Sequence, residues 1–155
     1  MNRNIILLAL SQAAMVTTIS LTLASSALVG AQLASPDLAT VPLAGQYLGT
    51  MVMLYPVARL MERFGRAPIF CGGALIGAVG LIAAAIGVKT DSFVLFSAAG
   101  FLIGTFGAVG QYYRFAAIEA VAPKHKNLAI SLTLTGGLIA AVAGPTLAQW
   151  TKGAL

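Results

Sequence analysis

The stretch Ala67–Val88 reads APIFCGGALIGAVGLIAAAIGV, and none of its 22 residues is charged. A helix needs about 20 mainly apolar residues to cross a hydrocarbon core that is ~30 Å thick. Four further intervals without Asp, Glu, Lys or Arg are 33, 21, 22 and 25 residues long: Asn4–Pro36, Leu38–Ala58, Ser92–Tyr113 and Asn127–Thr151. A soluble domain has no need of five such intervals, so the pattern predicts a polytopic membrane protein.

The composition supports this prediction. Apolar residues make up 59% of the chain and charged residues 8%, whereas a soluble domain carries about 25% charged residues. Apolar runs such as Leu75–Val88 lack the alternation that membrane barrel strands show. We therefore expect a single all-α membrane bundle over residues 1–155, joined by short loops. The expected transmembrane helices cover residues 4–29, 40–61, 68–88, 93–121 and 128–150.

The placement of the basic residues predicts the orientation. Six lie at one set of helix ends: Arg3, Arg59, Arg63, Arg66, Lys124 and Lys126. Only Lys89 and Lys152 lie at the other set. Because cytoplasmic loops are enriched in Lys and Arg, we expect the N-terminus in the cytoplasm and the C-terminus outside. Charges placed in this way indicate a lipid bilayer as partner, and no nucleic acid.

The chain offers no residues for catalysis or metal binding. Cys71 is the only cysteine and His125 the only histidine, and we interpret His125 as a polar loop residue. No catalytic triad, zinc motif or phosphate-binding loop is present, and no span holds a pair of carboxylates. We therefore expect a protein that is not an enzyme, without catalytic residues, metal or cofactor.

Glycines four residues apart mark faces where helices pack closely in lipid. Such pairs are Gly73 with Gly77 and Gly100 with Gly104. One face of the fourth helix continues from small to polar residues: Gly100, Gly104, Gly107, Gln111 and Arg114. Two interpretations stay open for this face, namely a packing seam and the lining of a water-filled path.

Arg114 lies in the otherwise apolar sequence Tyr112–Ala117. If the helix begins near Ser92, Arg114 is roughly 33 Å along it, at 1.5 Å per residue. Arg114 would then lie near the cytoplasmic interface, where a long basic side chain can snorkel. A charge inside a functional cavity is the other interpretation, and its partner would have to come from another helix.

The segment Ala58–Ala67, ARLMERFGRA, is the most specific local sequence. It resembles the loop signature of the major facilitator superfamily, usually Gly-x-Leu-Ala-Asp-Arg-x-Gly-Arg-Arg/Lys. Leu60, Arg63, Gly65 and Arg66 match it, and Glu62 stands for the usual Asp. The segment departs from the pattern at both ends, where Ala58 and Ala67 replace a Gly and a basic residue. We expect Gly65 to take the left-handed conformation that ends a helix, and Glu62 to pair with an arginine.

A second motif strengthens the resemblance. Gly136–Pro145, GGLIAAVAGP, is similar to the fifth-helix motif of drug-exporting members, in which Gly137, Gly144 and Pro145 match. Ala140 stands where a Gly is usual. The resemblance runs from the first helix to the fifth. Family members have twelve helices in two halves, so we expect this chain to be part of a longer transporter, or a short protein that works by association.

The resemblance implies a function and a site. It implies transport of a small solute by alternating access in a bacterial cytoplasmic membrane, with proton-linked export as one option. Helices one and four line the family's cavity, which places Gln12, Gln111, Tyr112 and Arg114 in the substrate site. The loop residues Glu62, Arg63, Gly65 and Arg66 would steady one end-state. The expected partners are the remaining transporter helices or a second copy. The alternative is a non-transporting assembly subunit that packs on partner helices.

Overall fold

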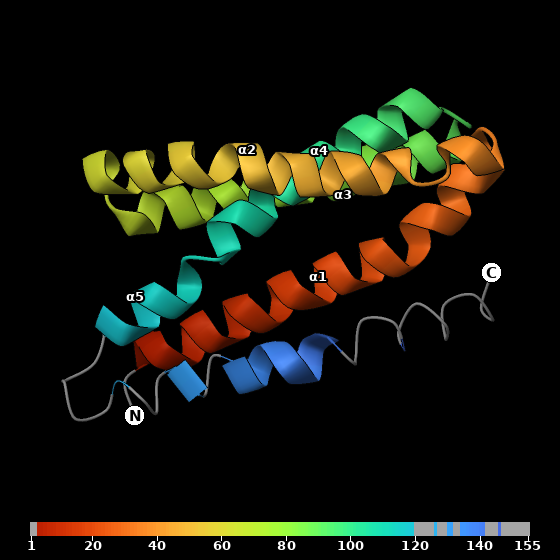
Figure 1. The fold of residues 1–155 in the computed structure, drawn as a ribbon. Coiled ribbons are helices and arrows are strands. Elements are labelled where there is room, and N and C mark those ends of the chain that lie inside the picture. The colour runs from red at the N-terminus through yellow and green to blue at the C-terminus, as the bar shows by residue number, and fades with distance from the viewer. Residues whose placement is uncertain (1–2, 120–125, 127–129, 132–133, 142–145, 147–155) are drawn as a thin grey trace. The chain divides into compact units, whose positions relative to one another are not determined.

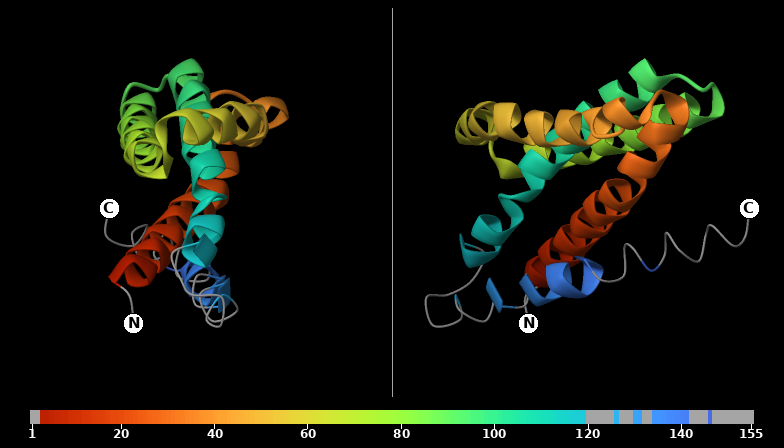
Figure 2. Two further views of the ribbon diagram at one scale, coloured as in Figure 1. Left: turned by 90° about the vertical axis from the view of Figure 1, so that its left-hand side faces the viewer. Right: turned by 45° about the vertical axis from the view of Figure 1, so that its right-hand side comes forward.

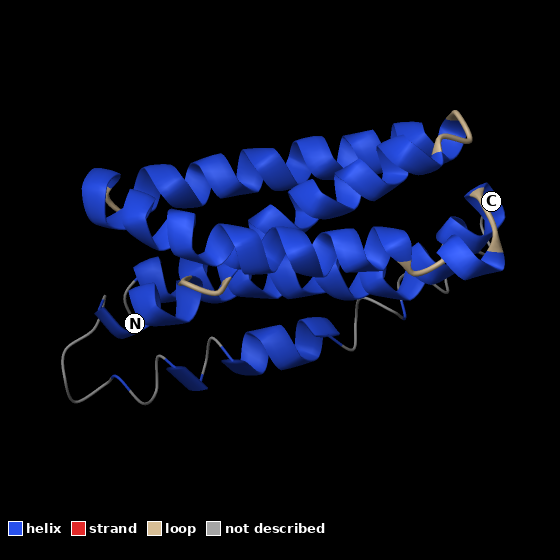
Figure 3. Cartoon of the chain, turned by 45° about the horizontal axis from the view of Figure 1, so that its top comes forward, coloured by secondary structure: helices blue, strands red, loops and turns tan. Residues whose placement is uncertain are grey.

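The computed structural model describes residues 3–119, 126, 130–131, 134–141 and 146. These residues form helices joined by short loops, with no strand among them (Figure 3), which confirms the all-α prediction. The helices are α1 (Arg3–Leu33), the 3₁₀ turn η1 (Pro36–Leu38), α2 (Val41–Phe64), α3 (Arg66–Lys89), α4 (Phe93–Gly110) and α5 (Tyr113–Glu119). Residues 134–141 are also helical. His125, Gly144 and Pro145 lie outside the described residues.

Three helical stretches within the described residues are long and apolar enough to cross a membrane. They are Ile6–Leu33, Arg66–Lys89 and Phe93–Glu119, with 28, 24 and 27 residues. Helix α2 is also 24 residues long, but Gln46 and two tyrosines make it less apolar. The chain is a multi-pass membrane protein, and the expected total of five spans stays a prediction.

The chain divides into two compact units. One unit comprises Met1–Leu21 and Gly110–Leu155, and the other comprises Thr22–Val109. The second unit contains the end of α1 together with α2, α3 and nearly all of α4. Within it, α2 and α3 run side by side in opposite directions (Figures 1 and 2).

Glycines bring the helices of the Thr22–Val109 unit to backbone distance. A Cβ atom added at Gly100 would lie 2.6 Å from the Pro42 carbonyl oxygen on α2, and one at Gly104 would collide with that of Gln46. On α3, a Cβ at Gly77 would lie 2.7 Å from Phe106 Cγ on α4. Since no real Cβ fits at such distances, these glycines form a packing seam. At Gly100 and Gly104 the structure therefore supports the packing interpretation.

Gly65 is the single residue between α2 and α3. Its backbone has φ +84° and ψ 167°, and its N–H donates to the Met61 carbonyl oxygen at 3.0 Å. The positive φ agrees with the sequence prediction, but the ψ is extended rather than left-handed helical. This region is accessible essentially to glycine alone, because a side chain clashes with the backbone there.

The fourth helix is not continuous over residues 93–121 as predicted. Helix α4 ends at Gly110, Gln111 and Tyr112 form a turn, and α5 begins at Tyr113. Glycine costs about 1 kcal/mol relative to alanine inside a helix. Because Gly104, Gly107 and Gly110 follow one another at three-residue intervals, they weaken the helix where it breaks.

Candidate functional site

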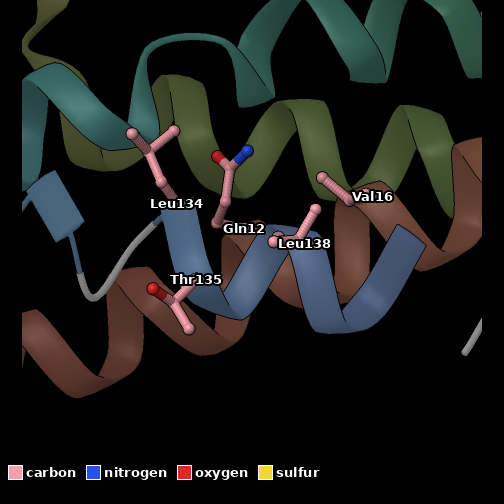
Figure 4. A pocket seen from close by; sticks show the side chains of 6 residues that line it. Gln12, Val16, Leu134, Thr135 and Leu138 are labelled. Atoms are coloured by element: carbon pink, nitrogen blue, oxygen red, sulfur yellow. The ribbon is translucent and has the colours of Figure 1, made fainter. Parts of the chain in front are cut away.

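Gln12 lies in a pocket of about 440 Å³ within the unit that comprises Met1–Leu21 and Gly110–Leu155. The pocket is lined by Gln12 and Val16 from α1 and by Leu134, Thr135, Gly137 and Leu138. In Figure 4 the Gln12 side chain stands between those of Leu134 and Leu138. The Gln12 Oε1 atom is buried and accepts no hydrogen bond from the described residues. The pocket is therefore apolar apart from the Thr135 hydroxyl and the Gln12 amide, whose oxygen can still accept a hydrogen bond.

Gly137, predicted as part of the fifth-helix motif, is buried beside α1. A Cβ atom at this position would lie 3.5 Å from Val16 Cγ2 and 3.7 Å from Gln12 Cγ. These are ordinary van der Waals distances, so the described neighbours do not require a glycine here. The contact nevertheless places this predicted motif residue directly against the predicted site residue Gln12.

The structure brings Gln111 and Arg114 together. Arg114 Nη2 donates to Gln111 Oε1 at 3.2 Å, and the guanidinium carbon lies 5.3 Å from the centre of the Phe115 ring. The Tyr112 ring is half-buried, with its centre 6.3 Å from that of Phe115. The recorded partner of Arg114 thus comes from its own segment, three residues earlier, and not from another helix as expected.

Arg114 keeps one unused donor. Its Nε is buried and donates to none of the described residues. A buried donor or acceptor left unsatisfied costs about 1–3 kcal/mol. The same cost applies to Gln12 Oε1. No recorded hydrogen bond among the described residues joins Gln12 to the Gln111–Arg114 pair, so the unsatisfied acceptor on Gln12 and the unsatisfied donor on Arg114 do not bond to each other.

The predicted loop residues lie at the junction of α2 and α3. Tyr55, Arg59, Glu62 and Arg63 line an open hollow of about 540 Å³. Arg59 Nε donates to the Tyr55 hydroxyl oxygen at 3.0 Å. Glu62 is exposed, and the described part of the chain records no ion pair between it and an arginine, contrary to expectation. Arg66 is half-buried at the start of α3.

Gln46 is a buried polar residue that the sequence analysis missed. Only 3% of its surface is exposed. Its Nε2 donates to Thr22 Oγ1 at 3.3 Å, and so joins α2 to α1 within the Thr22–Val109 unit. Gln46 is the only amide side chain in the charge-free interval Leu38–Ala58. That isolation was the available signal, because a lone amide in a membrane helix needs a partner.

Comparison with known proteins identifies the family. The model of the Major Facilitator Superfamily matches residues 5–151. The chain belongs to the Major Facilitator Superfamily. This confirms the resemblance drawn from the Ala58–Ala67 and Gly136–Pro145 motifs. No solved structure matches this superfamily chain.

Three curated relatives carry related names. The chain is 37% identical over 151 residues to the riboflavin transporter RfnT of Brucella anthropi. The aligned residues make up 97% of this chain and 38% of that protein. It is 31% and 30% identical to YddS and YdeG of Bacillus subtilis, both described as uncharacterized MFS-type transporters. These matches cover 77% and 81% of the chain. The chain spans 38%, 28% and 30% of the lengths of these relatives.

Proposed function

We propose that this chain forms part of the solute path of a secondary transporter that works by alternating access. The observation that carries the proposal is a pair of buried atoms, Gln12 Oε1 and Arg114 Nε, for which the described residues supply no hydrogen-bond partner. Ionisable side chains within membrane helices are costly, usually face the bundle interior or a water-filled cavity, and mark substrate or ion paths. A passing solute would supply the missing donor and acceptor in turn.

The solute class follows from the relative and from the chemistry of these groups. The Brucella anthropi relative is named a riboflavin transporter, and we take riboflavin as the first solute to test. Riboflavin is neutral and presents ring carbonyls, ring nitrogens and hydroxyl groups. An amide oxygen can accept from its N–H and O–H groups, and a guanidinium can donate to its carbonyls. The half-buried Tyr112 ring offers a surface on which a planar ring system can stack.

The coupling ion is a separate question. The carboxylates of the described residues lie at or beyond helix ends: Asp37, Glu62, Asp91 and Glu119. Proton relays within a membrane use Asp, Glu or His groups inside the span. If transport is proton-linked, as in the export that the family resemblance offers as one option, we infer that the coupling carboxylate belongs to helices beyond those described. Dissipating the proton gradient with a protonophore tests this linkage directly.

We also propose the membrane and the orientation. The bias of six basic residues against two supports a cytoplasmic N-terminus, and the bacterial relatives support a bacterial cytoplasmic membrane. Because the curated relatives are longer than this chain, the remaining transporter helices, or a second copy of the chain, would complete the cavity.

The test is riboflavin transport by vesicles that contain this protein in its functional form. We expect wild-type vesicles to move labelled riboflavin faster than empty vesicles. Gln12→Leu should slow this transport about tenfold, which is the effect of losing roughly one hydrogen bond. Gln32→Leu is the matched control, since Gln32 lies on the same helix but is exposed.

The outcomes separate the two functional classes. Normal rates with Gln32→Leu and slow rates with Gln12→Leu support a solute path at Gln12. Equal rates in both variants remove Gln12 from the path. Absence of transport of any solute by a correctly inserted wild-type protein would favour a non-transporting assembly subunit instead.

A further inference from the structure

The hollow at the end of α2 is built from two arginines that aromatic rings hold in place. The Arg59 guanidinium carbon lies 5.4 Å from the centre of the Tyr55 ring, and that of Arg63 lies 5.3 Å from the Phe64 ring. A guanidinium over an aromatic ring is attracted to the negative face of that ring. The rings thus fix both cations without using most of their N–H groups.

These N–H groups remain available. Arg59 uses Nε for the Tyr55 hydroxyl, and no acceptor for Arg63 is recorded in the part of the chain that the structure describes. Arg59 and Arg63 are four residues apart and therefore lie on one face of α2, about 5–6 Å apart at Cβ. Both are exposed and line the same hollow. Two guanidinium forks at this spacing can bind one phosphate group from two sides.

The charge of the lining favours a ligand with one negative charge. Arg59 and Arg63 contribute two positive charges and Glu62 one negative charge, which leaves one net positive charge. Glu62 also presents carboxylate oxygens that accept hydrogen bonds. A ligand with one phosphate and nearby hydroxyl donors would satisfy both kinds of group.

The surroundings of the hollow indicate a lipid rather than a soluble phosphate. It lies at the end of α2, beside the start of α3, a helix apolar enough to span a membrane. The ends of a membrane-spanning helix lie at the level of the lipid headgroups. Leu60 and Phe64 are 43% and 56% exposed next to the arginines, and they offer an apolar surface for an acyl chain.

We propose that this hollow binds a phosphatidylglycerol headgroup. Its phosphodiester lies between Arg59 and Arg63, and its glycerol hydroxyls donate to Glu62. Phosphatidylethanolamine and phosphatidylcholine are neutral overall, so they leave the net positive charge of the lining uncompensated. The proposal does not depend on the identity of the transported solute.

The test measures lipid retained by the purified protein. Native mass spectrometry from mixed micelles gives the occupancy for phosphatidylglycerol, phosphatidylethanolamine and phosphatidylcholine in turn. We expect phosphatidylglycerol to be retained most strongly. The double variant Arg59→Gln/Arg63→Gln should weaken phosphatidylglycerol binding roughly 25-fold. Each basic residue near an anionic lipid surface raises the affinity roughly fivefold, and the variant removes two of them.

Two controls make the result specific. Lys89→Gln removes an exposed cation at the opposite end of α3 and should leave phosphatidylglycerol occupancy unchanged. Arg59→Lys/Arg63→Lys keeps the charge but loses the planar forks, so its occupancy should fall between wild type and the glutamine variant. An unchanged thermal unfolding midpoint of the double glutamine variant shows that it is folded.

Three results would overturn the proposal. The first is equal retention of all three lipids by the wild-type protein. The second is unchanged phosphatidylglycerol occupancy in a folded double glutamine variant. The third is displacement of phosphatidylglycerol by millimolar inorganic phosphate, which would identify a phosphate site without lipid selectivity.

Discussion

Thr50 on α2 donates a hydrogen bond from Oγ1 to the carbonyl oxygen of Gly104 on α4, at 2.9 Å. The same hydroxyl lies 3.1 Å from the Gln46 carbonyl oxygen one turn earlier. A side chain can reach a neighbouring helix backbone in this way only where the helices nearly touch. Gly104 permits that approach because it has no Cβ atom, and the contact joins α2 and α4 within the Thr22–Val109 unit.

Gly104→Ala should destabilise the protein. The added Cβ would collide with the Gln46 carbonyl oxygen and lie 3.0 Å from the Thr50 nitrogen, and backbone atoms cannot move aside cheaply. Overpacking of this kind costs about 1–3 kcal/mol. Thermal unfolding in detergent measures the effect as a lower midpoint.

Gly72→Ala is the matched control for this prediction. Gly72 lies within α3 and an added Cβ would meet nothing within 4 Å. We expect a stabilisation of up to about 1 kcal/mol, because alanine favours a helix. If both alanine variants unfold at the wild-type temperature, the result would contradict the close approach of α2 and α4 at Gly104.

The Thr22–Gln46 pair should show a measurable coupling energy. In a double-mutant cycle of Thr22→Val and Gln46→Leu, we expect about 0.6 kcal/mol, which is the average for polar contacts between membrane helices, whose largest measured value is about 1.7 kcal/mol. Gln32→Leu, at an exposed position of α1, should show no coupling with Thr22→Val. A Gln46–Thr22 coupling of zero would mean that the buried amide bonds elsewhere.

Gly65→Val should impair transport while expression stays near normal. The φ of +84° strains any side chain, whereas an added Cβ would meet no atom within 4 Å, so the cost arises from the backbone, about 1–3 kcal/mol. From the family resemblance, we expect this turn to steady one end-state of the proposed transport cycle. Transport normalised to inserted protein is the measurement. A wild-type rate would mean that the turn is only a connector.

Cysteine labelling tests the orientation. Cys71 is free and exposed, so Cys71→Ser provides the background. A membrane-impermeant thiol reagent added outside should label Ser35→Cys and Asp91→Cys but not Lys126→Cys. Labelling of Lys126→Cys in sealed cells would contradict the proposed cytoplasmic N-terminus.

The sequence predicted those features that depend on composition and on local backbone rules. Charge-free intervals predicted helices such as Ala67–Val88, and the glycine between two helices predicted the positive φ of Gly65. The spacing of Gly100 and Gly104 predicted a close helix approach, with a packing seam as one of two interpretations of their face. These features follow from short-range patterns, because length, apolar content and the absence of a Cβ act locally.

Other features depended on contacts that the sequence does not encode locally. The helix break at Gln111–Tyr112 lies inside the charge-free interval Ser92–Tyr113. No change in charge marks the break, so hydropathy alone could not locate it. The Gln46–Thr22 contact joins residues 24 positions apart, and its partner could not be chosen from spacing. Within the candidate site, Gln111 was expected on the face of Arg114, but the hydrogen bond between them required the structure.

Arg114 allows the most direct test of the proposed solute path. If its buried Nε serves a solute, Arg114→Ala should reduce riboflavin transport at least about tenfold while the protein remains folded, because one charged hydrogen bond contributes about 1.5–3 kcal/mol. Arg114→Lys should also be slow, since lysine has no second planar donor to replace Nε.

The decisive measurement is the initial rate of riboflavin transport per inserted molecule for wild type, Arg114→Ala and Arg114→Lys in the same vesicles. Lys89→Ala, at an exposed position, serves as the control for loss of a cation and should keep the wild-type rate. We expect slow transport in both Arg114 variants. Full activity with Lys but not Ala would indicate a charge that only snorkels to the interface, and full activity in both would contradict a solute path at Arg114.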